Sequence, residues 1–497
     1  MMGATVLSKA LGMIRSMVMA RKYDIGIEAQ AFSEASHIPL TLFDLAFGAA
    51  ILGCFIPVYN SIKNDDGEND SFANTFLNFI LLAASLLSII GILCADGIIN
   101  LISPALDGEV KLLAAKLLRI MFPMIIFTGS TFTLVGVMQS KGRFLLPAMV
   151  SAISNAGVII YLIFIDGHLG EKGIYGLAVA YLVSWFLQLV TLAIPLTSSG
   201  FRYRPKIDWR SEHLKSALKM APPIMLGSWL TPISVLCGLY FAPFTQIDGA
   251  VTIFDYGLAA FTIISGILTY SICNYAFPML SKADGKEWSN IVRTGFSAAS
   301  AIILPFTVAA ILLSREITAV LYLGGSFGAD AADKTANVLQ CMLIGMPAFS
   351  VIELSSRTFY SKKNVKIPMF ASIAGIAVNI IASAILVKIP SLSVGSVGLG
   401  YALGLYAAAL VMIVSMFVLH RDVFEKSLWI NLLKLVVSTV ISSYVWIVTS
   451  SFFSLSPFDL SPIRNIINAL IIFLPGAVIY LVLLKLFKVK FKTELSD

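Results

Sequence analysis

FLNFILLAASLLSIIGILCA, at residues 76–95, is an almost entirely apolar run, long enough for an α-helix to cross a hydrocarbon core of about 30 Å. The run does not alternate at period two, which favours a membrane helix over a barrel strand. Similar runs recur, for example at 296–313 and 432–450. Of the chain's 497 residues, 58% are hydrophobic and 13% are charged. These are too few polar side chains to form the surface of a water-soluble globular protein of this length. We therefore expect an all-α polytopic membrane protein.

Hydropathy and turn residues divide the chain into about fourteen spans, the first near 4–22 and the last near 464–487. Loops after even-numbered spans carry most of the cations, among them Lys141, Arg143, Arg202, Arg204, Lys206, Arg210, Lys362, Lys363, Lys366, Arg421 and Lys426. Loops after odd-numbered spans are poorer in cations. Because cation-rich short loops stay in the cytoplasm, we expect a multi-pass membrane protein with both termini cytoplasmic.

An internal repeat organises the spans. The stretch SKGRFLLP at 140–147 resembles SKKNVKIP at 361–368, an offset of 221 residues (361 − 140), and Pro57 and Pro278 are separated by the same offset. These landmarks predict a duplicated six-helix unit whose copies run parallel, because six is even. We expect an N-terminal lobe at 1–197, a basic cytoplasmic linker at 198–216, a second lobe at 217–420, and two further helices with a cytoplasmic tail at 421–497. Two such lobes around a central cavity suit a transporter that works by alternating access.

The second span carries a polar stripe on an otherwise apolar helix. Glu34, His37, Thr41 and Asp44 fall within roughly 80° of one another at about 100° per residue. Ionisable groups inside a membrane usually face the bundle interior or a wet cavity, so each is a candidate for substrate binding. His37 could also couple transport to protons, although a membrane histidine is more often simply hydrogen-bonded.

The first span carries cations on several faces. Ser8, Arg15 and Lys22 are spaced by seven and nearly coincide on a helical wheel, whereas Lys9 and Arg21 lie on other faces. Arg15 can bind an anionic substrate or neutralise a carboxylate of the second span, and both interpretations stay open. Arg21 and Lys22 sit where long side chains reach the membrane surface.

The second lobe has one candidate pair in its tenth span. Glu353 and Arg357 are four residues apart, so they share a helix face and are expected to pair with each other. The full set of candidate substrate-binding residues is Arg15, Lys9, Arg21, Glu34, His37, Asp44 and Arg357.

Signals for catalysis are missing from the sequence. It contains no phosphate-binding glycine loop of the Walker type, no HExxH and no GxSxG in a hydrolase context, and its cysteines show no metal-ligand spacing. We therefore expect no enzymatic activity, no cofactor and no metal. The positive net charge reflects membrane topology rather than nucleic-acid binding.

Five motifs resemble the MurJ (MviN) lipid II flippase family of the multidrug/oligosaccharidyl-lipid/polysaccharide exporter superfamily. They are SKALGMIRSMVMAR at 8–21, FIPVY at 55–59, GVMQSKGRFLLPA at 136–148, LYLGGSF at 321–327 and RTFYSKKNVKIP at 357–368. The resemblance spans the whole chain and implies two six-helix lobes plus two C-terminal helices, in the bacterial cytoplasmic (inner) membrane. It also implies a substrate built on undecaprenyl pyrophosphate with a sugar headgroup, and arginines around a central cavity that bind the pyrophosphate. Arg15 matches the first-helix arginine, and Lys9 keeps a positive charge at another such position.

The chain departs from this family pattern at specific positions. Phe43 and Asp44 stand where the family often has a basic pair, Gln30 replaces an acidic residue, and no arginine occurs between Arg210 and Arg293, where the eighth helix is expected to supply one. A cavity with fewer cations should hold a pyrophosphate less firmly, so a lipid-linked envelope glycan other than lipid II stays open as the substrate.

Three functions remain as hypotheses. The leading one is a flippase for an undecaprenyl-pyrophosphate-linked peptidoglycan or other envelope-glycan precursor, with membrane lipids and envelope-synthesis enzymes as partners and no nucleic acid. The alternative is an ion-coupled exporter of small cationic drugs, which the acidic stripe would suit, although such exporters usually have twelve helices. A scaffold that recruits envelope-synthesis enzymes without transport is the third.

Overall fold

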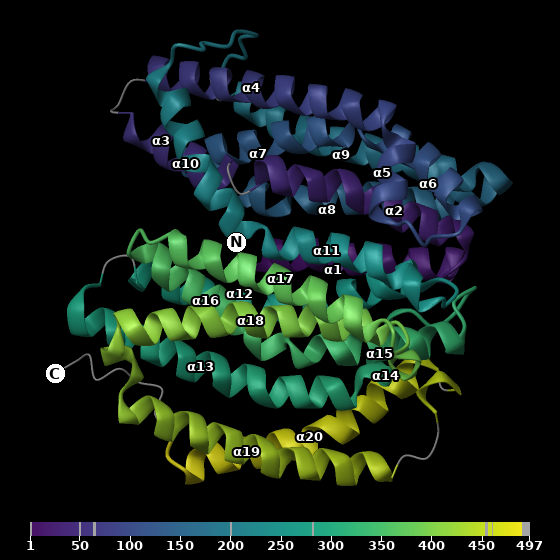
Figure 1. The fold of residues 1–497 in the computed structure, drawn as a ribbon, viewed down its shortest axis with the longest axis vertical. Coiled ribbons are helices and arrows are strands. Elements are labelled where there is room, and N and C mark those ends of the chain that lie inside the picture. The colour runs from purple at the N-terminus through teal and green to yellow at the C-terminus, as the bar shows by residue number, and fades with distance from the viewer. Residues whose placement is uncertain are drawn as a thin grey trace. The chain divides into compact units, whose positions relative to one another are not determined.

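The computed structural model describes residues 2–48, 51–62, 66–198, 201–280, 283–452, 456–459 and 461–489. The side chains of residues 2–6, 52, 66, 271 and 274–278 also lie outside the description, and these include the repeat landmark Pro278. Every secondary-structure element within the described ranges is helical (Figure 1). The predicted all-α fold is confirmed.

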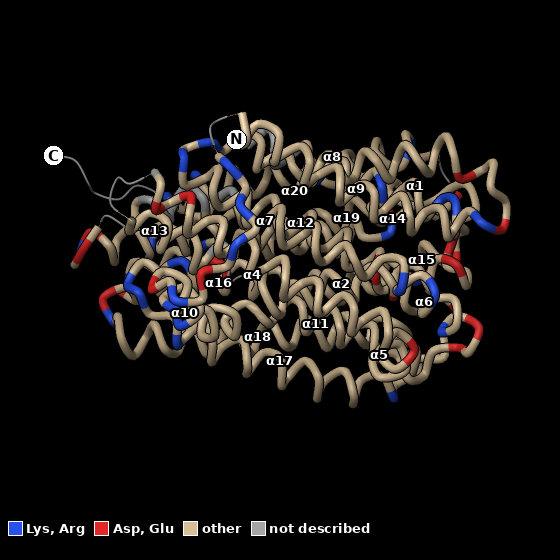
Figure 2. The backbone as a smooth tube through the Cα atoms, turned by 90° about the horizontal axis from the view of Figure 1, so that it is seen from above, with Lys and Arg blue, Asp and Glu red and all other residues tan. Residues whose placement is uncertain are grey.

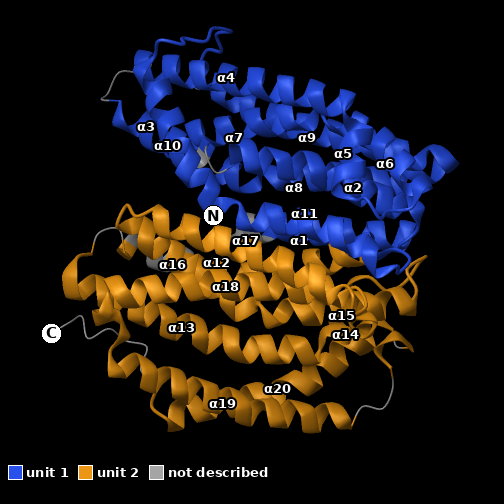
Figure 3. Ribbon diagram, in the orientation of Figure 1, with its two compact units in different colours: residues 1–252 blue, residues 253–497 orange. Residues whose placement is uncertain are grey.

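Residues Met1–Thr252 form the first compact unit (Figure 3). Its helices, with π and 3-10 segments labelled η, are α1 (Met2–Tyr23), α2 (Ile27–Phe43), η1 (Asp44–Gly48), η2 (Ile51–Phe55), α3 (Ile56–Ser61), α4 (Asp66–Leu93), α5 (Ala95–Ile102), α6 (Gly108–Met121), α7 (Met124–Ser140), α8 (Leu145–Ile160), η3 (Tyr161–Ile165), η4 (Asp166–His168), η5 (Gly170–Lys172), α9 (Gly173–Thr197), α10 (Glu212–Ser228), α11 (Leu230–Phe241) and η6 (Ala242–Thr245). The apolar run at 76–95 lies mostly in α4, which has no charged residue after Asp70.

Residues Ile253–Asp497 form the second unit. Its helices are most of α12 (Ala250–Leu280), then α13 (Gly285–Leu312), α14 (Ser314–Leu321), α15 (Ala329–Ile344), α16 (Met346–Ser361), α17 (Lys366–Leu386), η7 (Pro390–Leu392), α18 (Gly395–Leu419), η8 (Arg421–Phe424), α19 (Lys426–Ser451), η9 (Pro457–Asp459) and α20 (Pro462–Leu486). This division follows compactness and not the duplication, so the lobe boundaries drawn from the repeat stay predictions.

The described residues contain 10 helices that are long and apolar enough to cross a membrane, or up to 13 if each of three bent pairs is one span. The pairs bend by 44° between α6 and α7, 51° between α10 and the segment that begins with α11, and 45° between α15 and α16. Pro123 lies at the first break and Pro347 just after the third, where a missing backbone donor favours a bend. The α1 helix, which carries four cations, is not among these spans. The expected number of fourteen is therefore not confirmed.

Most charged residues lie near the ends of the helices (Figure 2). Lys141 Nζ lies 3.3 Å from Asp70 Oδ1 near the start of α4, and Arg119 pairs with Asp96 just beyond the end of α4. The two ion pairs thus lie at opposite ends of α4. Lys141 comes from a loop after an even-numbered span, whereas Asp96 directly follows the third, odd-numbered span. That arrangement fits a chain that crosses a membrane repeatedly, while the side that faces the cytoplasm remains a prediction.

Helices α17 and α18 of the second unit pack closely along their length. An ideal Cβ on Gly400 would lie 2.1 Å from Ser383 Oγ, and one on Gly404 would lie 2.8 Å from the carbonyl oxygen of Gly375. Small residues four apart let two helix backbones approach, which is how helices associate when lipid removes the hydrophobic driving force. The pair α17 and α18 therefore depends on glycine at these positions.

Candidate functional site

The second span changes its helical geometry at Asp44. The α-helix α2 ends at Phe43, and a π-helical segment, η1, begins at Asp44 itself. The π geometry widens the helix and is found frequently at functional sites. The Asp44 side chain is exposed and folds back over Gly48, since a Cβ on Gly48 would lie 2.7 Å from Asp44 Oδ1. Trp229 Nε1 donates to the carbonyl oxygen of Leu45 at 3.0 Å, which ties this segment to the end of α10.

Glu34 lies in a different environment from Asp44. Its side chain is 0% exposed, and Ser103 Oγ donates to Glu34 Oε1 at 2.6 Å. The same hydroxyl lies 3.2 Å from the carbonyl oxygen of Leu239, so Ser103 links α2 to α11. Thr41 is also buried and His37 is half-buried. Along the predicted stripe, Glu34 and Thr41 are thus enclosed by packed protein, His37 is partly accessible, and only Asp44, at the π segment, is exposed.

Arg15 is held by an aromatic residue of α9. Its Nη1 donates to the Tyr181 hydroxyl at 2.8 Å, and its guanidinium carbon lies 5.4 Å from the centre of the Tyr181 ring. Phe32 of α2 meets the same ring edge-on, with 5.4 Å between ring centres. Within the described part of the chain, Arg15 forms no ion pair with Glu34 or Asp44. The neutral partner leaves the full positive charge of Arg15 uncompensated by a carboxylate.

Small polar residues position Arg15 by fixing α1 against α8. The hydroxyls of Ser8 and Ser151 are hydrogen-bonded, and a Cβ on Gly12 would lie 3.4 Å from Asn155 Nδ2. Gly12 is one turn before Arg15, so α1 packs against α8 directly beside the arginine. Lys9 and Arg21, on other faces of α1, are half-buried.

An ion pair at the end of α1 was not predicted. Lys22 Nζ lies 2.6 Å from Asp166 Oδ2 and donates to the carbonyl oxygen of Leu162 at 2.8 Å, and the Tyr23 hydroxyl donates to Asp166 as well. Asp166 is only 6% exposed, so it binds the end of α1 to the turn before α9. Asp166 was visible in the sequence as an acidic residue directly after an apolar span. Its partner, Lys22, could not be identified because it lies 144 residues earlier in the chain.

Replacing Asp166 with Ala should lower the stability of the protein by about 1–3 kcal/mol, because a half-buried ammonium loses its carboxylate. The thermal unfolding midpoint of the purified protein in detergent measures this effect. The double variant Lys22→Met with Asp166→Leu removes both charges and should recover most of the loss. An unchanged midpoint for Asp166→Ala would rule out a structural role for this ion pair.

Arg357 belongs to the second unit. Its Nη2 lies 3.6 Å from Glu353 Oε2, so the predicted pairing of these two residues is confirmed. Both side chains are about one-quarter exposed, at 25% and 27%. An arginine already paired to a carboxylate has less charge to offer an anion than Arg15 has.

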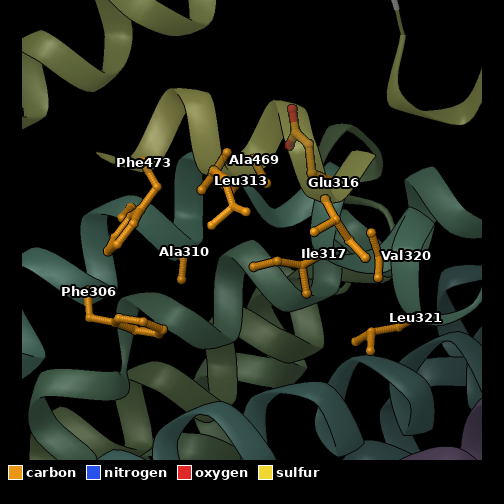
Figure 4. A pocket seen from close by; sticks show the side chains of 12 residues that line it. Phe306, Ala310, Leu313, Glu316, Ile317, Val320, Leu321, Ala469 and Phe473 are labelled. Atoms are coloured by element: carbon orange, nitrogen blue, oxygen red, sulfur yellow. The ribbon is translucent and has the colours of Figure 1, made fainter. Parts of the chain in front are cut away.

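The second unit also contains an apolar cavity of about 370 Å³ between α13, α14 and α20 (Figure 4). Phe306 and Phe473 lie on one side of it, and Glu316 is the one charged side chain among its lining residues. Such a lining suits a hydrocarbon chain and offers almost nothing to a sugar or a phosphate.

Three residues that contribute to the site were not predicted from the sequence: Tyr181, Ser103 and Trp229. Each is a common residue in an apolar helix or at a helix end, and each acts through one hydrogen bond to a distant element. The sequence alone offers no signal for such long-range partners.

Comparison with known proteins gives one consistent result. Residues 25–464 match the family model described as lipid II flippase MurJ. The lipid II flippase MurJ of Burkholderia cenocepacia is 26% identical over 441 residues, which cover 86% of this chain and 84% of that protein. A solved lipid II flippase MurJ in an inward closed conformation superimposes with a TM-score of 0.82 at 22% identity, covering 97% of each chain. An inward-facing multidrug resistance MATE transporter of the MOP superfamily gives 0.68 at 18% identity, covering 85% of this chain and 96% of that one.

Proposed function

The chain belongs to the lipid II flippase MurJ family, and on that premise we propose that it moves a lipid-linked cell-envelope precursor across the cytoplasmic membrane. The substrate class is an undecaprenyl pyrophosphate that carries a peptidoglycan or other envelope-glycan headgroup. Helices long and apolar enough to cross a membrane, in both units, support transport within a bilayer. The lower TM-score with the multidrug transporter gives the drug-export alternative less support.

The state of Arg15 carries the proposal. Its guanidinium is oriented by the Tyr181 hydroxyl and ring, yet neither of these neutralises its charge. A guanidinium binds phosphate oxygens through paired, charge-assisted hydrogen bonds, and it loses less entropy on binding when its orientation is already fixed. Arg15 is therefore the side chain we assign to the pyrophosphate.

The sidedness of the chain belongs to the same proposal. We place both termini and the basic linker at 198–216 in the cytoplasm, where cations in short loops are retained. The duplicated lobes at 1–197 and 217–420 would then bind the precursor on its side of synthesis and release it on the other. Envelope-synthesis enzymes that make or consume the precursor are the partners this route requires.

A translocation assay tests the proposal directly. The purified chain is reconstituted into liposomes that carry fluorescent lipid II, or a second undecaprenyl-pyrophosphate glycan, in both leaflets, and a membrane-impermeant reagent reports loss of label from the inner leaflet. Faster loss than in protein-free liposomes, for either lipid, is expected. If both lipids stay at the protein-free rate while a cationic dye is exported, the flippase function is excluded.

Asp44 separates the two transport hypotheses. Replacing Asp44 with Asn should leave translocation of the lipid-linked precursor unchanged or raise it by a few-fold, because an exposed carboxylate near the pathway repels a pyrophosphate. An exporter of cationic drugs would instead lose its activity. Asp44→Glu keeps the charge and serves as the control. A loss of precursor translocation in Asp44→Asn, with activity retained in Asp44→Glu, would contradict the expectation.

A further inference from the structure

The basic linker of the first unit is fixed along the start of α4. The Asn74 amide nitrogen donates to the carbonyl oxygen of Arg202 at 3.0 Å, and Asn74 Oδ1 accepts the backbone N–H of Arg204 at 2.8 Å. One turn later, the Asn78 amide nitrogen donates to the carbonyl oxygen of Arg204 at 2.7 Å, and its Oδ1 accepts the Tyr203 hydroxyl at 2.7 Å. The two asparagines hold the linker backbone as a neighbouring strand would, so its side chains occupy defined positions.

The linker presents cations that the protein does not neutralise. Arg202, Arg204 and Lys206 are all exposed, and none forms an ion pair with any described residue. They line a polar cavity of about 280 Å³ together with Asp70 and Asp208. Three unpaired cations against two carboxylates leave this cavity positive.

One of the two carboxylates, Asp70, is already paired with a cation. Asp70 pairs with Lys141 at 3.3 Å, and Asp208 Oδ1 accepts the backbone N–H of Arg210 at 3.0 Å. The hydrogen bond to Asp208 leaves its charge in place, so one unpaired carboxylate faces three unpaired cations among the lining residues. The lining keeps an excess of positive charge that an external anion can balance.

Aromatic residues place this cavity at the level of the lipid headgroups. Tyr203 and Trp209 are 49% and 58% exposed, and the Trp209 ring meets Phe79 of α4 edge-on at 6.2 Å between centres. Tryptophan and tyrosine gather where a membrane helix passes from hydrocarbon to water. The apolar part of α4 begins just past the cavity, so a lipid could insert its chains beside the helix while its headgroup reaches the cations.

We propose that the linker cavity binds the phosphodiester headgroup of an anionic phospholipid, such as phosphatidylglycerol, from the leaflet adjoining the linker. Guanidinium and ammonium groups recognise phosphate oxygens, and basic cavities at the cytoplasmic ends of membrane helices bind anionic headgroups. Inorganic phosphate offers the same oxygens but lacks chains that would lie beside α4 and Trp209. This inference does not depend on the transported substrate.

The test measures binding and proximity in the intact, purified chain in detergent. Short-chain phosphatidylglycerol, phosphatidylcholine and inorganic phosphate are titrated separately. In a second measurement, brominated phosphatidylglycerol quenches the fluorescence of nearby tryptophans, and the part of the quenching that is lost in Trp209→Phe reports contact with Trp209. Phosphatidylglycerol should bind more tightly than the other two and quench Trp209. The variant R202Q/R204Q/K206Q should weaken its binding by roughly fivefold for each cation removed.

A matched variant, K363Q/K366Q/K426Q, removes three exposed cations from the second unit and should bind phosphatidylglycerol as the unmodified chain does. Equal binding by R202Q/R204Q/K206Q and the unmodified chain overturns the proposal, as does phosphatidylcholine binding as tightly as phosphatidylglycerol. Inorganic phosphate binding as tightly as the lipid, without quenching, overturns the lipid assignment. If the triple variant does not fold, the unmodified chain provides the test. Its preference for phosphatidylglycerol over phosphatidylcholine should fall as the salt concentration is raised, and a preference that does not change with salt overturns the proposal.

Discussion

Arg15→Ala is expected to abolish translocation of the lipid-linked precursor, lowering the rate per folded molecule by roughly a hundredfold, since charge-assisted hydrogen bonds contribute about 1.5–3 kcal/mol each. The guanidinium is half-buried and oriented by Tyr181, and no carboxylate of the described residues pairs with it. Its loss therefore removes a positioned anion-binding group. The measurements are the liposome assay described above and rescue of cells depleted of their own flippase.

Two variants separate charge from position at this site. Tyr181→Phe keeps the ring under Arg15 but removes the hydroxyl that accepts its hydrogen bond, so translocation should fall by only about fivefold, the equivalent of one ordinary hydrogen bond. Arg464→Ala removes an exposed guanidinium at the start of α20 and should leave translocation unchanged. Translocation by Arg15→Ala at the unmodified rate would remove the assignment of the pyrophosphate to this residue.

The helical fold could be predicted because the signal is local. A run such as 76–95 must be helical in lipid, since its backbone groups find hydrogen-bond partners only within the helix. The number of spans was harder to predict. A hydropathy window joins α6 to α7 across Pro123 and does not reveal the 44° bend between them. A hydropathy window also cannot decide whether α1 crosses the membrane, because α1 contains four cations among its apolar residues.

The candidate site could be predicted only at residues whose side chains are energetically unfavourable inside a membrane. A charge in an apolar run must be paired or functional, which singled out Arg15 and the pair Glu353 and Arg357. The role of Tyr181 depends on α9 packing beside α1, and a tyrosine in an apolar helix has many uses. The π-helical start at Asp44 has no distinctive residue pattern, because widening a helix depends on the packing around it.

Gly404→Leu is expected to damage the second unit severely, lowering its stability by about 3 kcal/mol or more. A Cβ at this position would lie 2.7 Å from Asn379 Cβ and 2.8 Å from the Gly375 carbonyl oxygen, both on α17. Backbone cannot move aside as a flexible side chain can, so α17 and α18 would have to separate. The thermal unfolding midpoint and the yield of monodisperse protein on size-exclusion chromatography measure the effect.

Gly97→Leu is the matched control, because nothing lies within 4 Å of a Cβ on Gly97 and the residue is exposed on α5. It should leave the unfolding midpoint nearly unchanged, whereas Gly404→Ala, which adds only the clashing Cβ, should already lower it. Equal midpoints for Gly404→Leu and Gly97→Leu would mean that α17 and α18 are not held at the described distance. Translocation should distinguish the two kinds of damage: Gly404→Leu reduces the amount of folded protein, while Arg15→Ala reduces the rate of each folded molecule.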